Sequence, residues 1–247
     1  MSAAVASLWR HPIKSHGREK LTSVTLKKGC TMPWDRTWAV AHDASKATNV
    51  TWSPCAAFSR GSKAPALMAI NAVLDEGAER ITLCHPDRPD LTFHPDTEGD
   101  LLIDWVAPLM PADRAASARI VRVPGRGMTD TDYPSVTLFN SASHRAVEQQ
   151  LGQELSMKRW RGNIWVDGLA PWQEFNWLGR DVRVGDATLR IRERVKRCLA
   201  TTANPETGLR DTDTLGALKH WGHTDFGLYA EVIAGGDIAT GNAVQLL

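Results

Sequence analysis

The segment from Arg194 to Gly208, RVKRCLATTANPETG, carries the residues with the clearest potential for chemistry. Its cysteine, Cys198, follows a run of positive charge that comprises Arg190, Arg192, Arg194, Lys196 and Arg197. Nearby positive charge stabilises a thiolate, which is the form of cysteine that attacks electrophiles and binds soft metals. The segment therefore predicts a reactive or metal-ligating sulfur in a site that also attracts an anion. An inert, buried cysteine on a strand whose arginines face water is an equally open interpretation.

The basic run is expected to form a strand over residues 188–195. Because side chains alternate between the two faces of a strand, a regular strand would place the alternate cations and Cys198 on one face. A bulge would move the cysteine to the other face. We expect the outer arginines to be solvated, and we expect Lys196 and Arg197, which adjoin the sulfur, to be the functional cations.

Composition narrows the class of protein. The 247 residues suffice for one large domain or two small ones, and a net charge of +1 gives no general attraction to nucleic acid or to membranes. The four cysteines lie far apart, and no HExxH, phosphate-loop, dinucleotide-binding or GxSxG motif is present, so zinc is not expected. No apolar run approaches the roughly 18 residues of a membrane helix. We expect a cytoplasmic protein with reduced cysteines.

The pattern of elements predicts an α+β fold that is mostly β. Short strands are expected at 5–9, 23–26, 37–41, 69–74, 80–84, 119–123, 163–166, 182–184, 226–233 and 243–247. Helices are expected at 101–110, at 141–151 with Ser141 or Ser143 as the N-cap and Gly152 as the stop, and at 214–221 with Asp213 as the cap. We place the domain boundary near 111–118, which gives domains over 1–115 and 116–247. The polar loop GRGMTDTDYPS, which follows the strand at 119–123, is of a kind that often carries function.

Further polar residues could bind an anion. Lys14 and Ser15 follow a short strand that ends at a proline, and they offer an ammonium and a hydroxyl group to a phosphate. Arg36 lies between two tryptophans and could either pair with the preceding aspartate or clamp an anion. Arg161 and Asn163 offer a cation and an amide at the start of a strand. None of these residues identifies a site by itself.

The order of several motifs resembles that of a known family. These motifs are HPIKS, DRTWAV, DYPSVTLFNSAS, WRGNIWVDG, PWQEFNWLGRDVRVGD and KRCLATTANPETG. They are similar to the MOSC family, relatives of the C-terminal domain of molybdenum-cofactor sulfurases that include the amidoxime-reducing components. The resemblance spans nearly the whole chain. It implies a MOSC N-terminal β-barrel-like domain over 1–115 and a MOSC β-barrel domain with short helices over 116–247.

The resemblance also implies a site. Cys198 matches the cysteine that binds molybdenum through its sulfur, in agreement with the soft ligand expected from its surroundings. The positions that match cofactor contacts are Lys14, Ser15, Arg36, Tyr133, Pro134, Arg161, Asn163, Lys196, Arg197, Thr201 and Thr202. Glu174 is what remains of an acidic pair that often precedes the tryptophan of the central block in the reductases, and it is the second catalytic candidate beside Cys198.

The activity implied by the resemblance is that of a molybdenum-dependent oxidoreductase. It would reduce N-hydroxylated or otherwise N-oxygenated small molecules by oxygen-atom transfer, with molybdopterin as the cofactor and with electrons from a separate donor protein. Pyridoxal phosphate, nucleic acid and membrane are not expected as partners. Two alternatives stay open: a carrier that holds sulfur as a persulfide on Cys198 or delivers cofactor, and an ordinary barrel with an inert cysteine.

Overall fold

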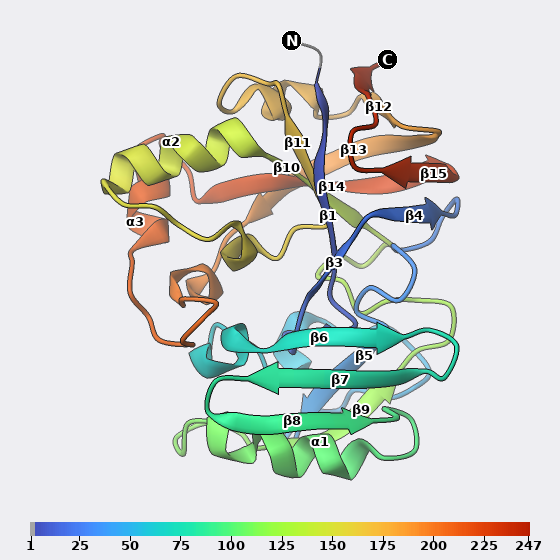
Figure 1. Cartoon of the computed structure of the whole chain (residues 1–247), viewed down its shortest axis with the longest axis vertical. Coiled ribbons are helices and arrows are strands. Elements are labelled where there is room, and N and C mark those ends of the chain that lie inside the picture. The colour runs from blue at the N-terminus through green and yellow to red at the C-terminus, as the bar shows by residue number, and fades with distance from the viewer. Residues whose placement is uncertain (1–2) are drawn as a thin grey trace.

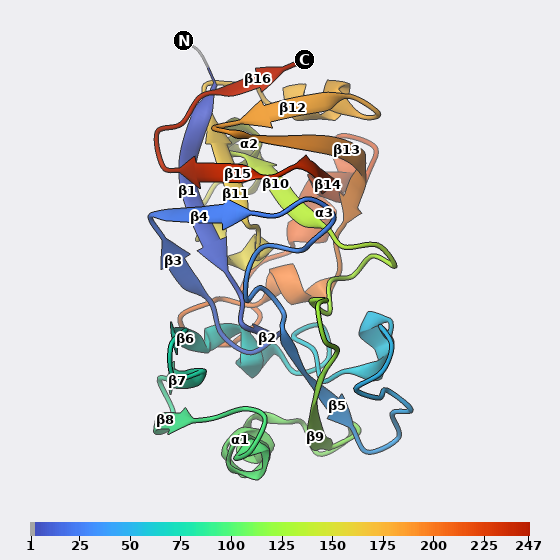
Figure 2. The ribbon, with the colours of Figure 1, turned by 90° about the vertical axis from the view of Figure 1, so that its right-hand side faces the viewer.

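The structure, a computed structural model, describes residues 3–247 and is mostly β with few helices, as the sequence predicts. Two lobes lie one above the other in Figure 1. The upper lobe contains a large sheet with the helices α2 (Ser141–Leu151) and α3 (Thr214–Lys219), and the lower lobe contains two small sheets and the helix α1 (Gly99–Val106). The segments that run between the lobes come from distant parts of the sequence (Figure 2).

The upper lobe is built on an eight-stranded sheet. Neighbouring strands of this sheet are antiparallel, except for β10 (Val136–Asn140) and β11 (Ile164–Asp167), which are parallel. A two-stranded sheet of β4 (Ser23–Leu26) and β15 (Gly236–Ala239) lies beside it, and Leu26 and Ile238 from that pair are buried in the same core. The order of strands in the large sheet is β16 (Val244–Leu246), β12 (Asp181–Val184), β13 (Ala187–Lys196), β14 (Asp225–Ala234), β10 (Val136–Asn140), β11 (Ile164–Asp167), β1 (Ala4–Arg10) and β3 (Glu19–Leu21).

The lower lobe combines two three-stranded sheets with α1. One sheet has the order β2 (Ile13–Lys14), β5 (Trp38–His42) and β9 (Ser117–Arg122), and the other has the order β6 (Asn71–Asp75), β7 (Arg80–His85) and β8 (Arg88–Phe93). Strand β5 is buried on both faces, because Trp38 packs into the cluster with α1 whereas Ala39 packs with Phe58 on the other side. Burial on both faces fixes the position of β5, and Arg36, one of the candidate site residues, lies two residues before this strand.

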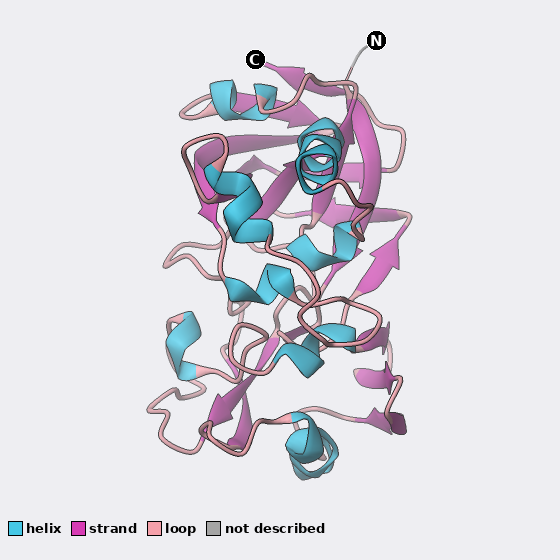
Figure 3. Cartoon of the chain, turned by 90° about the vertical axis from the view of Figure 1, so that its left-hand side faces the viewer, coloured by secondary structure: helices cyan, strands magenta, loops and turns pink. Residues whose placement is uncertain are grey.

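The helices of the upper lobe cover one face of the large sheet (Figure 3). Helix α2 spans the predicted residues and ends at Gly152, which adopts the left-handed φ of 66° that favours glycine. The predicted N-cap was wrong, because Asn140, the last residue of β10, accepts the hydrogen bond from the Ala142 amide. The predicted cap of α3 is confirmed, since the Asp213 side chain accepts from the Gly216 amide.

Short 3₁₀ segments complete the fold. They are η1 (Cys55–Ala57), η2 (Pro65–Ala69), η3 (Ala107–Leu109), η4 (Met157–Trp160), η5 (Gln173–Trp177) and η6 (Leu199–Thr202). Segment η3 continues the helix predicted at 101–110, which is α helical only to Val106. Segments η1, η4 and η6 lie at the junction of the lobes and carry or adjoin several of the candidate site residues.

The pairing of strands crosses the predicted domain boundary. Strands β1 and β3 join the large sheet and β4 pairs with β15, although all three precede residue 116. Strand β9 follows residue 116 and pairs with β5 in the lower lobe. The boundary itself stays a prediction. The crossing matters for the site, because the chain passes between the lobes at residues 10–19, 26–38 and 122–136.

Candidate functional site

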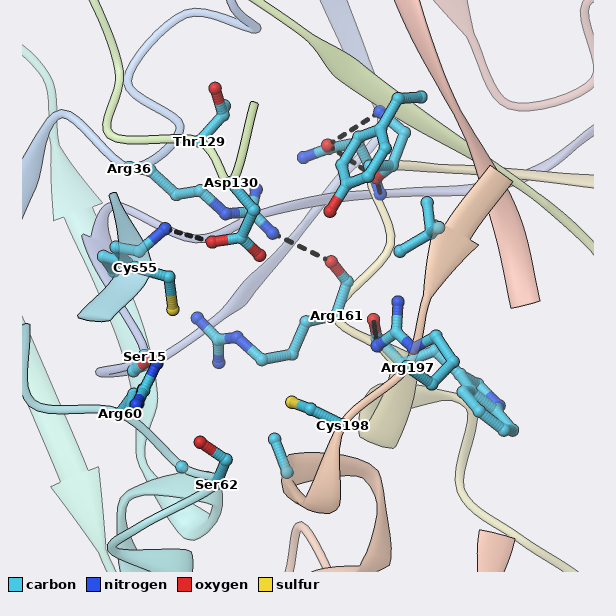
Figure 4. Close-up of a pocket in the computed structure, with 18 of the residues that line it drawn as sticks. Ser15, Arg36, Cys55, Arg60, Ser62, Thr129, Asp130, Arg161, Arg197 and Cys198 are labelled. Atoms are coloured by element: carbon cyan, nitrogen blue, oxygen red, sulfur yellow. Dashed lines mark hydrogen bonds and ion pairs between the residues drawn. The ribbon is translucent and has the colours of Figure 1, made fainter. Parts of the chain in front are cut away.

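A pocket at the junction of the two lobes brings Cys198 together with several cations (Figure 4). It encloses about 710 Å³, counted with its open mouth. Seven predicted site residues line it: Lys14, Ser15, Arg36, Arg161, Asn163, Arg197 and Cys198. The lining draws on segments from both lobes, so the fold assembles the pocket from parts that are distant in sequence.

Cys198 is held by the turn that follows it. The residue is exposed and extended, with φ −127° and ψ 177°, directly after β13. Its carbonyl accepts hydrogen bonds from the amide and the hydroxyl of Thr201, at 3.2 and 3.1 Å. The Thr201 hydroxyl lies 2.6 Å from that of Thr214, at the start of α3. The turn η6 is thereby anchored to a helix, and the Cys198 thiol points into the pocket (Figure 4).

The basic run before Cys198 contributes only its last member to the pocket. Arg190 and Arg192 are exposed and pair with Asp181 and Glu231 across neighbouring strands. The pairing of β13 with β14 shifts register between residues 191 and 193 and again between 194 and 196, so the strand is not regular. Lys196 is exposed and does not line the pocket.

Arg197 is fixed against the aromatic wall of the pocket. Its Nη2 donates to the Trp160 carbonyl at 2.7 Å, and its guanidinium lies over the rings of Phe139 and Trp160. The Phe139 ring packs against Gly162, where a Cβ atom would lie only 2.3 Å from the ring. The glycine that follows Arg161 is therefore required by this packing.

The other cations of the pocket come from elsewhere in the chain. They are Lys14 from β2, Arg36 from the turn before β5, Arg60 from the loop after η1, and Arg161 from the turn after η4. Ser15, Arg36 and Arg161 have φ values of 63°, 53° and 52°, in the left-handed region that non-glycine residues rarely occupy. This conformation costs about 1–2 kcal/mol for each residue. Strained backbone that gathers on one pocket is typical of a functional site.

A buried ion pair supports Arg36. Its guanidinium donates to Oδ2 of Asp35, which is fully buried, and Oδ1 of Asp35 accepts from the His11 amide at 2.8 Å. Burial alone would raise the pKa of Asp35, but the Arg36 charge and the hydrogen bonds from His11 hold this pKa well below its usual range. Burial, with the charges of Arg161 and Arg36, lowers the pKa of His11 to about 3, so His11 is neutral. Arg36 thus both pairs with its neighbour and lines the pocket.

Arg161 is a cation of the pocket that is only partly compensated. Its Nη2 donates to the Gly17 carbonyl at 3.1 Å, whereas its Nη1 is buried and has no hydrogen-bond partner among the described residues 3–247. Burial and the nearby charges of Arg36 and Arg18 lower its pKa to about 9. Five cationic side chains line the pocket, and Asp130 is the one carboxylate among the lining residues. The pocket therefore carries excess positive charge, which suits an anionic ligand.

Two predicted site residues, Asn163 and Thr202, make hydrogen bonds that hold the backbone around the pocket. The Asn163 side chain accepts from the amide and hydroxyl of Thr137 and donates to the Trp9 carbonyl, so it ties β10 to β1. Thr202 does not line the pocket, and its hydroxyl donates to the Leu199 carbonyl at 2.8 Å within η6. Both residues, like Thr201, act on the backbone around the site.

Three further predicted residues lie outside the pocket. The Tyr133 hydroxyl donates to Glu193 at 2.8 Å on the surface, and Pro134 follows it in the same loop. Glu174 is fully buried in η5, where its carboxylate accepts from Asn140 and Ser143 at 2.7 Å. Burial raises its pKa, although these hydrogen bonds oppose the rise. In this position Glu174 does not line the pocket and joins η5 to the start of α2, and its catalytic role stays a prediction.

The sequence analysis did not single out several residues that line the pocket. Cys55, Arg60 and Ser62 come from the loop that contains η1, and Gly61 brings this loop against η6, where its added Cβ would lie 3.6 Å from Ala200. The others are Thr129, Asp130, Ser135, Thr137, Phe139, Trp160, Val195, Ala200 and Tyr229. Thr129 and Asp130 lie in the loop GRGMTDTDYPS, whose polar composition is of a kind that often carries function. The run SRGSK around Arg60 has a glycine between cations, which is a weak signal by itself.

Comparison with known proteins identifies the family. A model of the MOSC N-terminal β-barrel domain matches residues 2–101, and a model of the MOSC domain matches residues 128–245. The chain therefore belongs to the MOSC family, as the order of its motifs predicts.

Individual relatives are distant. The chain is 28% identical over 153 residues to the mitochondrial amidoxime-reducing component 1 of Mus musculus, in a match that covers 56% of this chain and 44% of the mouse protein. The YUAD protein of Bacillus subtilis has a similar fold, with a TM-score of 0.50 and 11% identity over 99% of this chain and 94% of that one. The YiiM protein of Geobacillus stearothermophilus overlaps 45% of this chain and 53% of its own, with a TM-score of 0.36 and 18% identity.

Across residues 3–247, no helix is both long enough and apolar enough to cross a membrane.

Proposed function

We propose that the pocket binds the molybdenum cofactor and that Cys198 is the sulfur ligand of the molybdenum. The observation that carries this proposal is the exposed Cys198 thiol on the wall of a pocket lined by five cations. A soft metal suits the thiolate, and an anionic pterin phosphate suits the cations. Membership of the MOSC family and the distant relation to an amidoxime-reducing component support the same assignment.

The residues present fit such a group. The buried Nη1 of Arg161 lacks a hydrogen-bond partner, which a phosphate oxygen would supply. Lys14, Arg36 and Arg60 would add charge, and the Ser15 hydroxyl would add a donor. Arg197 lies next to Cys198 and would offset the negative charge of a bound thiolate centre. The four cysteines of the chain are free thiols, which supports a reducing, cytoplasmic setting for such a site.

We infer that the activity is the reduction of N-hydroxylated small molecules. The substrate would take up two electrons and two protons and lose its oxygen as water, so that an N–OH group becomes N–H. The cofactor, when bound, would supply the two-electron and oxygen-atom chemistry, and the Cys198 sulfur would hold its metal. The chain itself would bind and orient the cofactor and the substrate. Arg36 and Arg161 would bind negatively charged groups, and the wall of Phe139 and Trp160 would exclude water on one side. Electrons would come from a separate donor protein.

Metal and pterin content test the binding proposal. Protein made in a host that synthesises the cofactor should contain close to one molybdenum and one pterin for each chain. Cys198→Ser should lose most of the molybdenum. The matched control is Cys84→Ser, because Cys84 lies in β7 away from the pocket. Equal molybdenum content in the wild type and the Cys198 variant would refute the role of this sulfur.

Turnover separates a reductase from a carrier. The loaded protein should reduce benzamidoxime to benzamidine with a chemical electron donor, and Cys198→Ser should not. A loaded protein that shows no turnover, but accepts labelled sulfur on Cys198, would refute the reductase and favour a carrier.

A further inference from the structure

Asp130 stands out in the pocket because it has the wrong charge for an anion site. It is the one carboxylate among the lining residues, and its Oδ1 accepts a hydrogen bond from the Lys14 ammonium. Lys14 is almost fully buried, with 3% of its side chain exposed, whereas Asp130 is 48% exposed. Lys14 is therefore the buried member of this ion pair and Asp130, which is labelled in Figure 4, is the exposed one.

The segment that carries Asp130 is held by side chains. Residues 128–133 belong to no strand, and most of their carbonyls accept hydrogen bonds from side chains. The pairs are Lys14 with Met128, Trp52 with Thr129, Arg126 with both Thr131 and Asp132, and the Thr131 hydroxyl with Tyr133, at 2.7 to 2.9 Å. The Arg126 guanidinium also lies 5.2 Å from the centre of the Trp52 ring. These contacts fix the carboxylate next to Lys14.

The charges around Asp130 keep it ionised. Partial removal of water from the carboxylate would by itself raise its pKa. The positive charges of Lys14, Arg36 and Arg197 instead lower that pKa well below the usual range. A negative charge at this place neutralises part of the cationic pocket. An incoming phosphate would have to share or replace it, because Lys14 has no other carboxylate partner among the ion pairs of residues 3–247.

We propose that Asp130 is a built-in counter-ion that competes with anionic ligands for Lys14. The inference rests on the proposed anion site and adds to it a residue that opposes binding. With no ligand bound, Asp130 compensates the cations of the pocket. When an anion binds, the Lys14 ammonium turns to it, and Asp130 loses its partner. Affinity for small anions is thereby kept low, so that a ligand needs further contacts, such as a sulfur bond to Cys198, to bind tightly.

Pyrophosphate binding to the cofactor-free full chain, measured by isothermal titration calorimetry, tests this inference without molybdenum. Asp130→Asn should bind pyrophosphate about tenfold more tightly than the wild type, a difference of about 1.4 kcal/mol. This magnitude lies between that of an exposed ion pair and that of a buried one. The matched control is Asp132→Asn, which removes the same charge from an exposed residue two positions along and should change affinity by less than twofold.

A double-mutant cycle assigns the effect to Lys14. In a Lys14→Met background, Asp130→Asn should change pyrophosphate affinity by less than twofold, because the contested cation is gone. Asp130→Ser serves as the second variant if the asparagine protein folds poorly. Unchanged or weaker binding by both Asp130 variants would overturn the inference, and so would equal tightening by Asp132→Asn. If the wild type and all variants bind no pyrophosphate, the anion site fails as well, whereas tight binding without molybdenum retention would refute only the cofactor proposal.

Discussion

Arg161→Met is expected to stabilise the ligand-free protein and to weaken its binding of anions. Within residues 3–247, the guanidinium has one hydrogen bond, to the Gly17 carbonyl, and no carboxylate partner. Methionine keeps an unbranched apolar side chain in the same space. The contact between Arg36 and the Arg161 carbonyl, at 3.1 Å, involves only the backbone of residue 161 and survives the substitution.

The magnitude follows from the pKa of Arg161. The lowering of this pKa from the ordinary value of an arginine to about 9 amounts to roughly 5 kcal/mol at about 1.36 kcal/mol for each pKa unit. The net gain is smaller, because partial exposure screens the charge and the lost hydrogen bond is worth about 1 kcal/mol. We expect an increase of about 1–3 kcal/mol in the free energy of unfolding. The folded state binds the proton more weakly than the unfolded state, so this penalty is fully present at every pH below about 9.

Urea denaturation of cofactor-free protein at pH 7 and low salt measures the effect. Adding pyrophosphate should stabilise the wild type through mass action and should stabilise Arg161→Met much less. The matched control is Arg159→Met, two residues earlier, where a guanidinium that is 4% exposed pairs with Asp211 at 2.7 Å. Loss of this pair should destabilise the protein by about 1–3 kcal/mol. The reasoning is refuted if the Arg161 variant is destabilised as much as the Arg159 variant.

Three other predictions follow from single contacts. Gly127→Ala should lower the free energy of unfolding by about 2–4 kcal/mol in urea denaturation, because a Cβ atom would lie 2.3 Å from the Asp35 carbonyl oxygen. Burial lowers the pKa of His16 to about 4. The unfolded state binds more protons below pH 6.5, so stability should fall by up to about 1.4 kcal/mol for each pH unit from 6.5 to about 4, and His16→Asn should flatten this slope. Iodoacetamide should modify Cys198 fastest in the native protein, and pyrophosphate should slow this reaction but not that of Cys84, as followed by peptide mass spectrometry.

Matched control variants distinguish these predicted effects from a general loss of stability. Gly99→Ala should be close to neutral, because its Cβ would come no nearer than 3.5 Å to another atom, and a loss equal to that of Gly127→Ala would contradict the steric argument. His220→Asn, at an exposed histidine, is the control for the loss of an imidazole. An unaltered slope in His16→Asn would show that another group titrates. Alkylation of Cys198 at the same rate with and without pyrophosphate would contradict the placement of its thiol beside the anion site.

Elements with strong local signals could be predicted from the sequence. The helix at 141–151 has apolar residues at helical spacing and a glycine stop, and the structure has α2 at those residues. The strands expected at 69–74 and 80–84 are present as β6 and β7, which pair as a hairpin. In both cases the residues that determine the element lie within a few positions of one another, so no knowledge of distant contacts is needed.

Strands β8, β10 and β15 were not predicted, for physical reasons that differ. All five residues of β10 are buried, so the strand lacks the alternation that marks a strand with one solvated face. Strand β8 contains Pro89, which disfavours a central strand but is tolerated at the edge of the sheet, where β8 lies. Two adjacent glycines, such as those at 235 and 236, are typical of a turn, yet Gly236 begins β15, and its backbone packs so closely on Asp186 that a side chain would not fit.

The basic run before Cys198 shows where reasoning from neighbouring residues fails. A regular strand was expected to gather its cations beside the sulfur, but register shifts in β13 and ion pairs with neighbouring strands keep the outer arginines on the surface. The cations that line the pocket with Cys198 are distant in sequence, apart from Arg197. Resemblance to the family, rather than charge density, placed Lys14, Arg36 and Arg161 in the site.

The location of the pocket between the lobes explains which of its residues could be predicted from the sequence and which could not. Backbone that passes between two lobes has few strand partners, so its carbonyls and charges must be satisfied by side chains that come from either lobe. This requirement produces the left-handed Arg36 and Arg161, each held by contacts outside its own segment, and it also brings Asp130 next to Lys14. Such contacts depend on loop paths that no periodicity encodes. A site of this kind is therefore visible in sequence only through motifs that have kept their order, whereas its electrostatic balance, five cations against one competing carboxylate, becomes visible only in the folded chain.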